Sequence, residues 1–254
     1  MAIALVTGAS SGLSEEFAWQ LATAGHQVVL VGRSRDRLSE VAHTLTGATG
    51  VAAELLPADL TTEAGRGAVA ERLADQARPV SLLVNNAGFG LGAGFAATTW
   101  EQEKALLDIH VTAPAQLAHA ALPGMIARGH GAVLTVSSIA AHLGNSTYAA
   151  HKRWQVEFTQ ALAGQLAGTG VTATVVLPGL VRTHFHDSPE LAHMREEYPD
   201  QAWLDPEDVV AGALAAVRRG QTVVTPTARY AVAGALAGLL PKRLTRGRRS
   251  LQRD

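Results

Sequence analysis

The chain has 254 residues, of which 47% are hydrophobic, so it can bury one sizeable core and we expect a single domain over residues 1–254. Its formal net charge of -1 gives no general attraction to nucleic acid or to an anionic membrane surface, which favours a small molecule as the partner. The absence of cysteine excludes disulfides, thiolate metal sites and cysteine nucleophiles.

Short apolar runs rich in β-branched residues alternate with longer helical patterns along the chain. Continuous apolar runs such as residues 27–31 suit strands that are buried on both faces of a sheet. The predicted strands are residues 3–6, 28–31, 51–56, 81–84, 133–136, 172–177 and 222–224. Neither an internal repeat nor a low-complexity linker divides the chain. We therefore predict an α/β fold, a doubly wound parallel sheet of about seven strands with helices on both faces.

The position of the first strand and the length of the apolar stretches indicate where the protein is located. The first predicted strand begins at Ile3, which leaves no room for an export signal, so we expect a cytoplasmic protein. The longest apolar stretches, residues 209–217 and 230–240, are too short and too rich in alanine and glycine to span a bilayer. We expect no stable membrane insertion.

A turn rich in glycine and serine follows the first strand directly and precedes a helical pattern over residues 15–23. A strand, a tight glycine turn and a helix N-terminus together place backbone N–H groups where a pyrophosphate can bind. This context favours a dinucleotide site over an ordinary turn. The candidate cofactor-binding residues of the turn are Gly8, Ser10, Ser11, Gly12 and Leu13.

The second predicted strand is followed by Arg33. An acidic residue at this strand end would hydrogen-bond the adenosine ribose and repel a 2′-phosphate, whereas a guanidinium pairs with that phosphate. The missing acid and the presence of Arg33 favour NADP over NAD. The alternative interpretation, a solvated basic start of a helix, suits Arg35 and Arg37 better.

Tyr148 and Lys152 lie four residues apart in a helical pattern, so both side chains can approach one ligand from the same helix face. We expect Lys152 to lower the pKa of Tyr148 from about 10 toward working pH, as a general acid/base requires. Such a pair is frequent by chance and usually marks only an amphipathic helix. Here Ser138 ends an apolar strand upstream, where open α/β sheets place their ligands.

Taken in order, these motifs resemble the short-chain dehydrogenase/reductase family over residues 1–183. The residues that carry the resemblance are Thr7-Gly8-x-x-x-Gly12, Asp59-Leu60, Asn85-Asn86-Ala87-Gly88, Ser138, Tyr148-x-x-x-Lys152 and Pro178-Gly179. The resemblance implies one Rossmann-like domain with strand order 3-2-1-4-5-6-7. It also implies an NADP(H)-dependent oxidoreductase that interconverts a secondary alcohol and a ketone or aldehyde, assembled as a homodimer or homotetramer.

The resemblance also assigns roles by position. Ser138 would donate a hydrogen bond to the substrate oxygen while Tyr148 exchanges the hydroxyl proton with it. Lys152 would also hold the nicotinamide ribose, so Tyr148 and Lys152 both border the cofactor. Asp59 and Leu60 would flank the adenine. The remaining implied cofactor contacts are Asn86, Ala87, Gly88, Pro178, Gly179, Val181 and Thr183.

Three features depart from the family pattern. Ser14 replaces the third glycine of the phosphate turn, and its hydroxyl would either cap the helix or reach a phosphate. His110 occupies the position of the family's catalytic asparagine. It would either sustain a proton relay that titrates near neutral pH or be satisfied by a backbone carbonyl. The interval from Ser138 to Tyr148 is shorter than the commonest family spacing, so the role of Ser138 depends on geometry.

Two further segments invite other hypotheses. Residues 183–205 read as a polar insertion that selects the substrate, ending in Asp205 as a helix N-cap before Pro206. The sequence gives the histidines of this insertion no carboxylate geometry that would complete a metal-binding set, so we expect no metal site. They are His184, His186 and His193. The basic tail, residues 241–254, reads as solvated rather than as a contact for nucleic acid or acidic lipid.

The alternative function is a catalytically weak NADP-binding sensor or scaffold, which the substitutions at Ser14 and His110 suggest. An intact Ser138, Tyr148 and Lys152 favour the enzyme, because a protein that only binds has no need of an acid/base pair.

Overall fold

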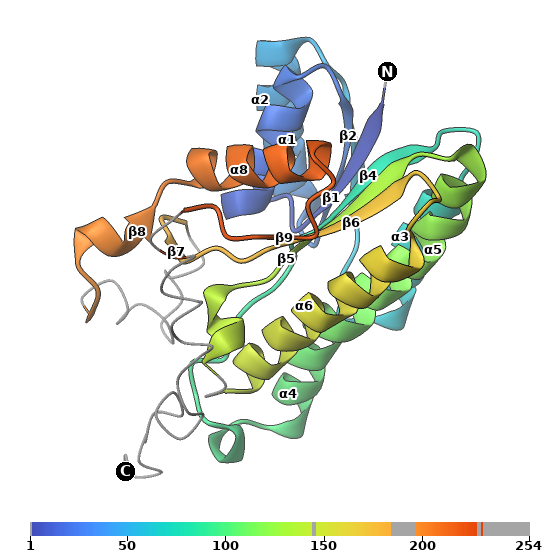
Figure 1. Ribbon diagram of the computed structural model, residues 1–254. Coiled ribbons are helices and arrows are strands. Elements are labelled where there is room, and N and C mark those ends of the chain that lie inside the picture. Colours follow the sequence, from blue (N-terminus) through green and yellow to red (C-terminus); the bar gives the residue numbers. More distant parts are fainter. Residues whose placement is uncertain (1, 144–145, 184–196, 228–229, 231–254) are drawn as a thin grey trace.

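The computed structural model describes residues 2–143, 146–183, 197–227 and 230, and it shows a parallel β-sheet covered by helices on both faces (Figure 1). The seven-stranded sheet has the order β3-β2-β1-β4-β5-β6-β9, and each neighbouring pair is parallel. The strands are β1 (Ile3–Thr7), β2 (Gln27–Gly32), β3 (Ala53–Pro57), β4 (Val80–Asn85), β5 (Gly131–Val136), β6 (Val171–Val176) and β9 (Val223–Val224). The predicted sheet and its strand order are confirmed.

Alternate residues of the central strands enter two separate cores, one on each face of the sheet. In β1, Leu5 packs in one core, while Ala4 and Val6 pack in the other. Because successive side chains of a strand point to opposite faces, a strand buried on both faces must be apolar throughout. This is the physical reason for the uninterrupted apolar runs in the sequence.

The helices divide between these two cores. Those that supply buried side chains to the core around Val6 are α1 (Gly12–Thr23), α2 (Arg35–Thr49) and α8 (Pro206–Arg218). Those that supply the core around Leu5 are α3 (Glu63–Ala74), α5 (Ala113–Arg128) and α6 (Thr147–Gln165). Figure 1 shows α1 and α8 on one side of the sheet and α5 and α6 on the other. Among the described residues, no helix has both the length and the apolar character needed to cross a membrane.

The helical segment over residues 100–128 is interrupted by a wider turn. The helix α4 (Trp100–Leu107) runs into a π-helical turn, η2 (Asp108–Thr112), which leads directly into α5. Short π-helical segments inside helices are rare and are frequent at functional sites. His110 lies in this turn.

Two short strands, one before the predicted insertion and one near its end, pair with each other. The strand β7 (Leu180–Val181) pairs in parallel with β8 (Trp203–Leu204) as a small second sheet. Helix α8 starts at Pro206 with Asp205 at its N-cap position, as expected, but the Asp205 side chain makes no cap hydrogen bond. Its carboxylate instead pairs with Arg182 at 3.2 Å, because the two-stranded pairing brings that guanidinium beside it.

Candidate active site

The carboxyl ends of β1 and β4 are joined by the side chain of Thr7. Its hydroxyl donates to Val84 O at 3.2 Å and accepts from the backbone N–H groups of Asn86 and Ala87 at 3.0 and 3.1 Å. The connections from β1 lead to β2 on one side of it, and the chain later returns to place β4 on its other side. The carboxyl ends of β1 and β4 therefore form the switch point at which doubly wound sheets bind ligands. The sequence analysis did not assign Thr7 a role, although it stands at the strand end before the glycine turn.

Ser14 does not cap the helix, whose N-cap residue is Ser11, and this corrects the capping expectation for its hydroxyl. The buried hydroxyl donates to Thr7 O at 2.9 Å and accepts a short hydrogen bond from Asn86 Nδ2. A Cβ at Gly8 would lie 3.0 Å from Ala87 Cα and 3.2 Å from Ser14 Oγ, and Gly8 has a φ of 76°. Through these two hydrogen bonds Ser14 joins α1 to β1 and to the segment after β4.

The glycine turn faces the segment after β7. Gly12 has a φ of 63°, and a Cβ there would lie 3.3 Å from the Cβ of Thr183. Ser11 precedes α1 in extended conformation and makes no side-chain cap hydrogen bond. A helix amino end beside two left-handed glycines fits a pyrophosphate, since its backbone N–H groups point along the helix axis toward that position.

The carboxyl ends of β2 and β3, beside the glycine turn, carry charged residues. Arg33 is exposed immediately after β2. Asp59 follows β3, and burial raises its pKa, but hydrogen bonds from the Thr61 N–H and hydroxyl at 2.9 and 2.8 Å, with the charge of Arg33, bring that pKa below its usual value. Arg37 pairs with Glu40 at 2.7 Å, as the solvated interpretation of that residue requires.

Leu60 differs from the other predicted adenine contact. Its side chain is buried in the core with Val29 and Val69. Its carbonyl accepts from Arg66 at 3.0 Å. The Leu60 side chain therefore packs in the core against one face of the sheet. Asp59 is the residue of this pair whose polar side chain lies at the end of β3.

Ser138, Tyr148 and Lys152 come together at the carboxyl ends of the strands. Ser138 follows β5, and its hydroxyl hydrogen-bonds with Tyr148 and accepts from Ala140 N at 3.1 Å. Lys152 Nζ lies 5.6 Å from the centre of the Tyr148 ring. The shortened interval between Ser138 and Tyr148 holds a 3-10 turn, η3 (Ile139–His142), before α6 begins.

Burial controls the ionisation of this group. It raises the pKa of Tyr148 well above its usual value, although the hydrogen bond with Ser138 lowers it. The expected net lowering of the Tyr148 pKa is therefore wrong, because the cost of removing the phenolate from water outweighs the hydrogen bond with Ser138. Lys152 is itself 4% exposed and donates to Val136 O at 2.8 Å, and burial lowers its pKa to about 7.

His110 packs directly against this group. Its ring meets the Tyr148 ring edge-on at 5.3 Å between centres, and its Nε2 hydrogen-bonds with Phe89 O at 2.8 Å. A Cβ at Gly88 would collide with the His110 ring, so the glycine makes room for it. Burial, then the charge of Lys152, holds the pKa of His110 well below its usual value. The predicted titration near neutral pH is wrong, while the predicted backbone-carbonyl partner is present.

Two residues that the sequence analysis missed hold the surrounding loops. Gln155, one turn after Lys152, donates to His110 O at 2.9 Å and fixes the π-helical turn. The Tyr230 ring packs against Gly179 so closely that a side chain at residue 179 would collide with it. The Tyr230 hydroxyl donates to Ala202 O and accepts from Leu180 N. Both contacts join segments far apart in the sequence, so neither has a local signal.

The remaining predicted cofactor contacts lie along the loop that carries Pro178. Its carbonyl accepts from Ile139 N at 3.0 Å, which ties this loop to the segment after Ser138. Val181 is buried in β7, and Thr183 faces Gly12. His184, His186, His193 and the tail of residues 241–254 lie outside the described residues. Within the described ranges, no cluster of three or more His, Asp or Glu side chains could hold a metal.

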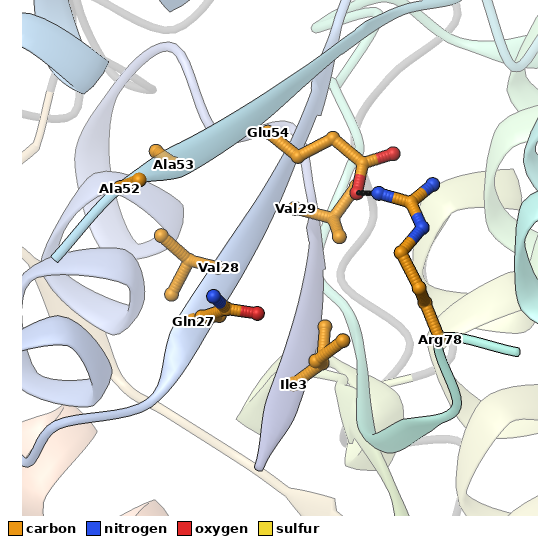
Figure 2. A pocket seen from close by; sticks show the side chains of 8 residues that line it. All are labelled: Ile3, Gln27, Val28, Val29, Ala52, Ala53, Glu54 and Arg78. Carbon is orange, nitrogen blue, oxygen red and sulfur yellow. Dashed lines mark hydrogen bonds and ion pairs between the residues drawn. The ribbon is translucent and has the colours of Figure 1, made fainter. Parts of the chain in front are cut away.

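A hollow of about 200 Å³ lies at the opposite, amino end of the strands (Figure 2). Ile3, Gln27 and Ala53 line it where their strands begin, and Arg78 pairs there with Glu54 at 3.1 Å. Doubly wound sheets bind ligands at the carboxyl ends of their strands. This hollow is therefore not the candidate site.

A family model described as short chain dehydrogenase matches residues 2–192. The chain belongs to the short-chain dehydrogenase family. Its sequence is 29% identical over 220 residues to an uncharacterized oxidoreductase of Staphylococcus saprophyticus, covering 85% of this chain and 91% of that protein. It is 33% identical over 218 residues to sulfoacetaldehyde reductase 2 of Chromohalobacter salexigens, covering 82% and 84%.

The same family membership is visible in three dimensions. A short-chain dehydrogenase from Sphingobium yanoikuyae, solved in complex with NADPH, superposes with a TM-score of 0.84 at 32% identity. The match covers 100% of this chain and 99% of that one. The chain is therefore an oxidoreductase of the short-chain dehydrogenase family with a Rossmann-like fold.

Replacing Ser14 tests its bridging role. Ser14→Ala removes the donor to Thr7 O and leaves Asn86 Nδ2 without its acceptor, so we expect the free energy of unfolding to fall by about 1–3 kcal/mol. Urea unfolding measures the change, and Ser39→Ala at an exposed position of α2 is the control. Equal midpoints for the two variants would contradict the bridge.

The buried Lys152 predicts a pH-dependent stability. Its pKa is about 7 in the folded protein and near 10.5 when unfolded, so between these values the unfolded chain binds more protons. The free energy of unfolding should therefore contain a contribution that rises with pH from about 7 to about 10.5. Lys152→Met should flatten this rise relative to the wild type in urea unfolding series. Parallel pH profiles would show that Lys152 keeps an ordinary pKa in the fold.

Proposed function

We propose that this protein is an NADP(H)-dependent oxidoreductase that interconverts a secondary alcohol and a ketone or aldehyde. The observation that carries the proposal is the convergence of Ser138, Tyr148 and Lys152 at the strand edge that also bears the glycine turn. An acid/base group beside a dinucleotide-type turn suits hydride chemistry, in which the carbonyl oxygen must gain or lose a proton.

The cofactor would be held by two groups of residues at the carboxyl ends of the strands, one around the glycine turn and one along the loop from Pro178 to Thr183. The glycine turn would take the pyrophosphate on the amino end of α1, with Asn86, Ala87 and Gly88 beside it. Pro178, Gly179, Val181 and Thr183 would border the nicotinamide, as the resemblance to the family implies. Thr183 faces Gly12, which brings this segment against the glycine turn. When bound, the cofactor supplies or accepts the hydride.

The protein's own residues handle the oxygen and its proton. Ser138 donates a hydrogen bond to the substrate carbonyl and keeps it beside Tyr148. Tyr148 is neutral because burial raises its pKa, so in reduction its hydroxyl can give a proton to the oxygen as the alcohol forms. Lys152 in its protonated form stabilises the resulting phenolate, since its Nζ lies close to the ring.

The preference for NADP rests on Arg33. Its exposed guanidinium follows β2, where no carboxylate occupies the next positions that would face the adenosine ribose. The relative from Sphingobium yanoikuyae with NADPH bound supports the same assignment. A guanidinium pairs with a phosphate through charge-assisted hydrogen bonds, which NAD lacks the group to form.

The proposal extends to the whole chain. Residues 1–254 would form a single cofactor-binding domain, with the segment 183–205 contributing to the choice of a small carbonyl or alcohol substrate. A cytoplasmic homodimer or homotetramer is the assembly we propose, which size-exclusion chromatography with light scattering measures.

Tyr148→Phe tests the acid/base role. The substitution removes only the hydroxyl, so NADPH binding should persist while kcat for ketone reduction falls by about 10²–10⁴-fold. Ketone-dependent oxidation of NADPH across a panel of carbonyl compounds measures the rate, and fluorescence titration measures binding. A wild type that oxidises NADPH with none of the panel, or a variant with unchanged kcat, would overturn the proposed reaction.

Arg33→Ser tests the cofactor preference. Loss of the guanidinium should raise the KM for NADPH about ten- to one hundredfold and change the KM for NADH little. Arg37→Ser is the matched control, because Arg37 already pairs with Glu40. If both variants keep the same ratio of the two KM values as the wild type, Arg33 does not read the phosphate.

A further inference from the structure

The hydroxyl of Tyr230 joins the starts of the two short strands beside the candidate cofactor site. It donates a short hydrogen bond to Ala202 O, immediately before β8, and accepts from Leu180 N at 3.4 Å, where β7 begins. Leu180 is the register partner of Trp203, so both contacts lie at the same end of this small sheet. The acid/base and cofactor roles proposed above leave Tyr230 without a function.

The Tyr230 ring fills the space beside Gly179. A Cβ at residue 179 would lie 2.2 to 2.5 Å from three carbons of that ring, which is too close for any real contact. Gly179 does not have a positive φ, so its backbone conformation does not require glycine. The missing side chain at residue 179 is therefore needed for the close approach of the ring.

The loop that Tyr230 contacts is also fixed to the acid/base half of the site. Pro178 O accepts from Ile139 N at 3.0 Å, which holds the loop to the segment directly after Ser138. The pair Pro178–Gly179 is therefore held by one contact with the segment after Ser138 and by another with the Tyr230 ring.

An apolar cluster extends the contacts of Tyr230 to the glycine turn. The buried side chains of Val181, Leu204 and Val209 form this cluster, and Leu13 and Tyr230 pack against it. Leu13 lies in the first turn of α1, where we expect the pyrophosphate. Because tightly packed side chains resist displacement, the Tyr230 ring and the first turn of α1 together fix the position of β7.

Exposed ion pairs hold the same two strands less firmly. Arg182 pairs with Asp205 at 3.2 Å and with Asp200 at 3.5 Å, but all three side chains are exposed to solvent. Water screens such pairs, so they contribute little to stability. Beyond their own backbone pairing, β7 and β8 therefore depend mainly on the Tyr230 hydroxyl and the apolar cluster.

We propose that Tyr230 is a positioning residue for the nicotinamide end of the cofactor, because it holds the loop of residues 178–183 in place against the glycine turn. The inference rests on the proposed function, in which this loop borders the nicotinamide. Tyr230 acts through Gly179 and Leu180 and takes no part in proton or hydride transfer. Since its hydroxyl also holds Ala202, it links this loop to the segment that would select the substrate.

The effect of Tyr230 should be confined to one end of the cofactor. Arg33 and Asp59, which would hold the adenosine end, follow β2 and β3 on the far side of β1 from β6. The contacts of Tyr230 described above reach β7, β8 and the apolar cluster instead. Adenosine 2′,5′-bisphosphate carries the 2′-phosphate but lacks the nicotinamide, so its binding reports on the adenosine end alone.

Calorimetric titration with NADP⁺ and with adenosine 2′,5′-bisphosphate tests the proposal without turnover. Tyr230→Phe loses only the hydroxyl, so the Kd for NADP⁺ should rise about three- to tenfold. Tyr230→Ala also loses the ring and should raise this Kd further. Both variants should bind the bisphosphate as the wild type does. Val171→Ala, in the core at the amino end of β6, controls for a general loss of stability and should change neither Kd.

The outcomes of the titration separate the inference from the proposed function. If Tyr230→Ala weakens both nucleotides equally, or binds NADP⁺ as tightly as the wild type, the inference alone is overturned. A wild type that binds neither nucleotide overturns the proposed function, and the inference with it.

A second substitution tests whether the ring acts through Gly179. Gly179→Ala places a Cβ against the Tyr230 ring and must displace the loop, so the Kd for NADP⁺ should rise about tenfold or more. In the Tyr230→Ala background the same change should raise it less than about threefold, since the ring is no longer in the way. Equal fold-changes in the two backgrounds would show that the loop does not depend on the ring, which overturns the proposal.

Discussion

The Thr7 hydroxyl joins the two strand ends between which the winding of the sheet reverses, and it anchors the segment that lies between the glycine turn and the acid/base group. Through it, the segment Asn86–Gly88 is held against the glycine turn. Ser14 adds a second tie from α1 to the same segment. Because this segment also carries the carbonyl of Phe89, which fixes His110, the cofactor half and the acid/base half of the edge share one support.

Burial is the second physical constraint on the site. It raises the pKa of Tyr148 and lowers those of Lys152 and His110, so the neutral form of each group is favoured in the protein without a ligand. A neutral phenol is ready to donate a proton, and a lysine with a pKa of about 7 exchanges its proton easily near neutral pH. The site is thus prepared for proton transfer by exclusion of water as much as by any single charge.

The sequence predicted the architecture well because its signals are local or ordered. Strands buried on both faces require uninterrupted apolar runs, and all seven predicted runs are strands of the sheet. The resemblance to short-chain dehydrogenases gave the strand order, and the structure brings Ser138, Tyr148 and Lys152 together as that resemblance implies. The roles of these residues in the reaction remain proposals.

What the sequence could not give depends on long-range contacts and on burial. The Ser14 hydroxyl has a partner 72 residues away in Asn86, and the Asp205 carboxylate is taken by Arg182 instead of the helix N-terminus. Gln155 and Tyr230 act on backbone groups of distant segments. The direction of the Tyr148 pKa shift follows from how much water its surroundings exclude, which a spacing of four residues to a lysine does not reveal.

The central claim is that NADP binds along the carboxyl edge of the sheet with its reactive end beside the acid/base group. A crystal structure of the protein with NADP⁺ tests it most directly. The account predicts the 2′-phosphate against Arg33, the pyrophosphate on the amino end of α1, and the nicotinamide between Thr183 and Tyr148. A cofactor bound at another surface, or one whose nicotinamide lies away from Tyr148 and Lys152, would contradict it.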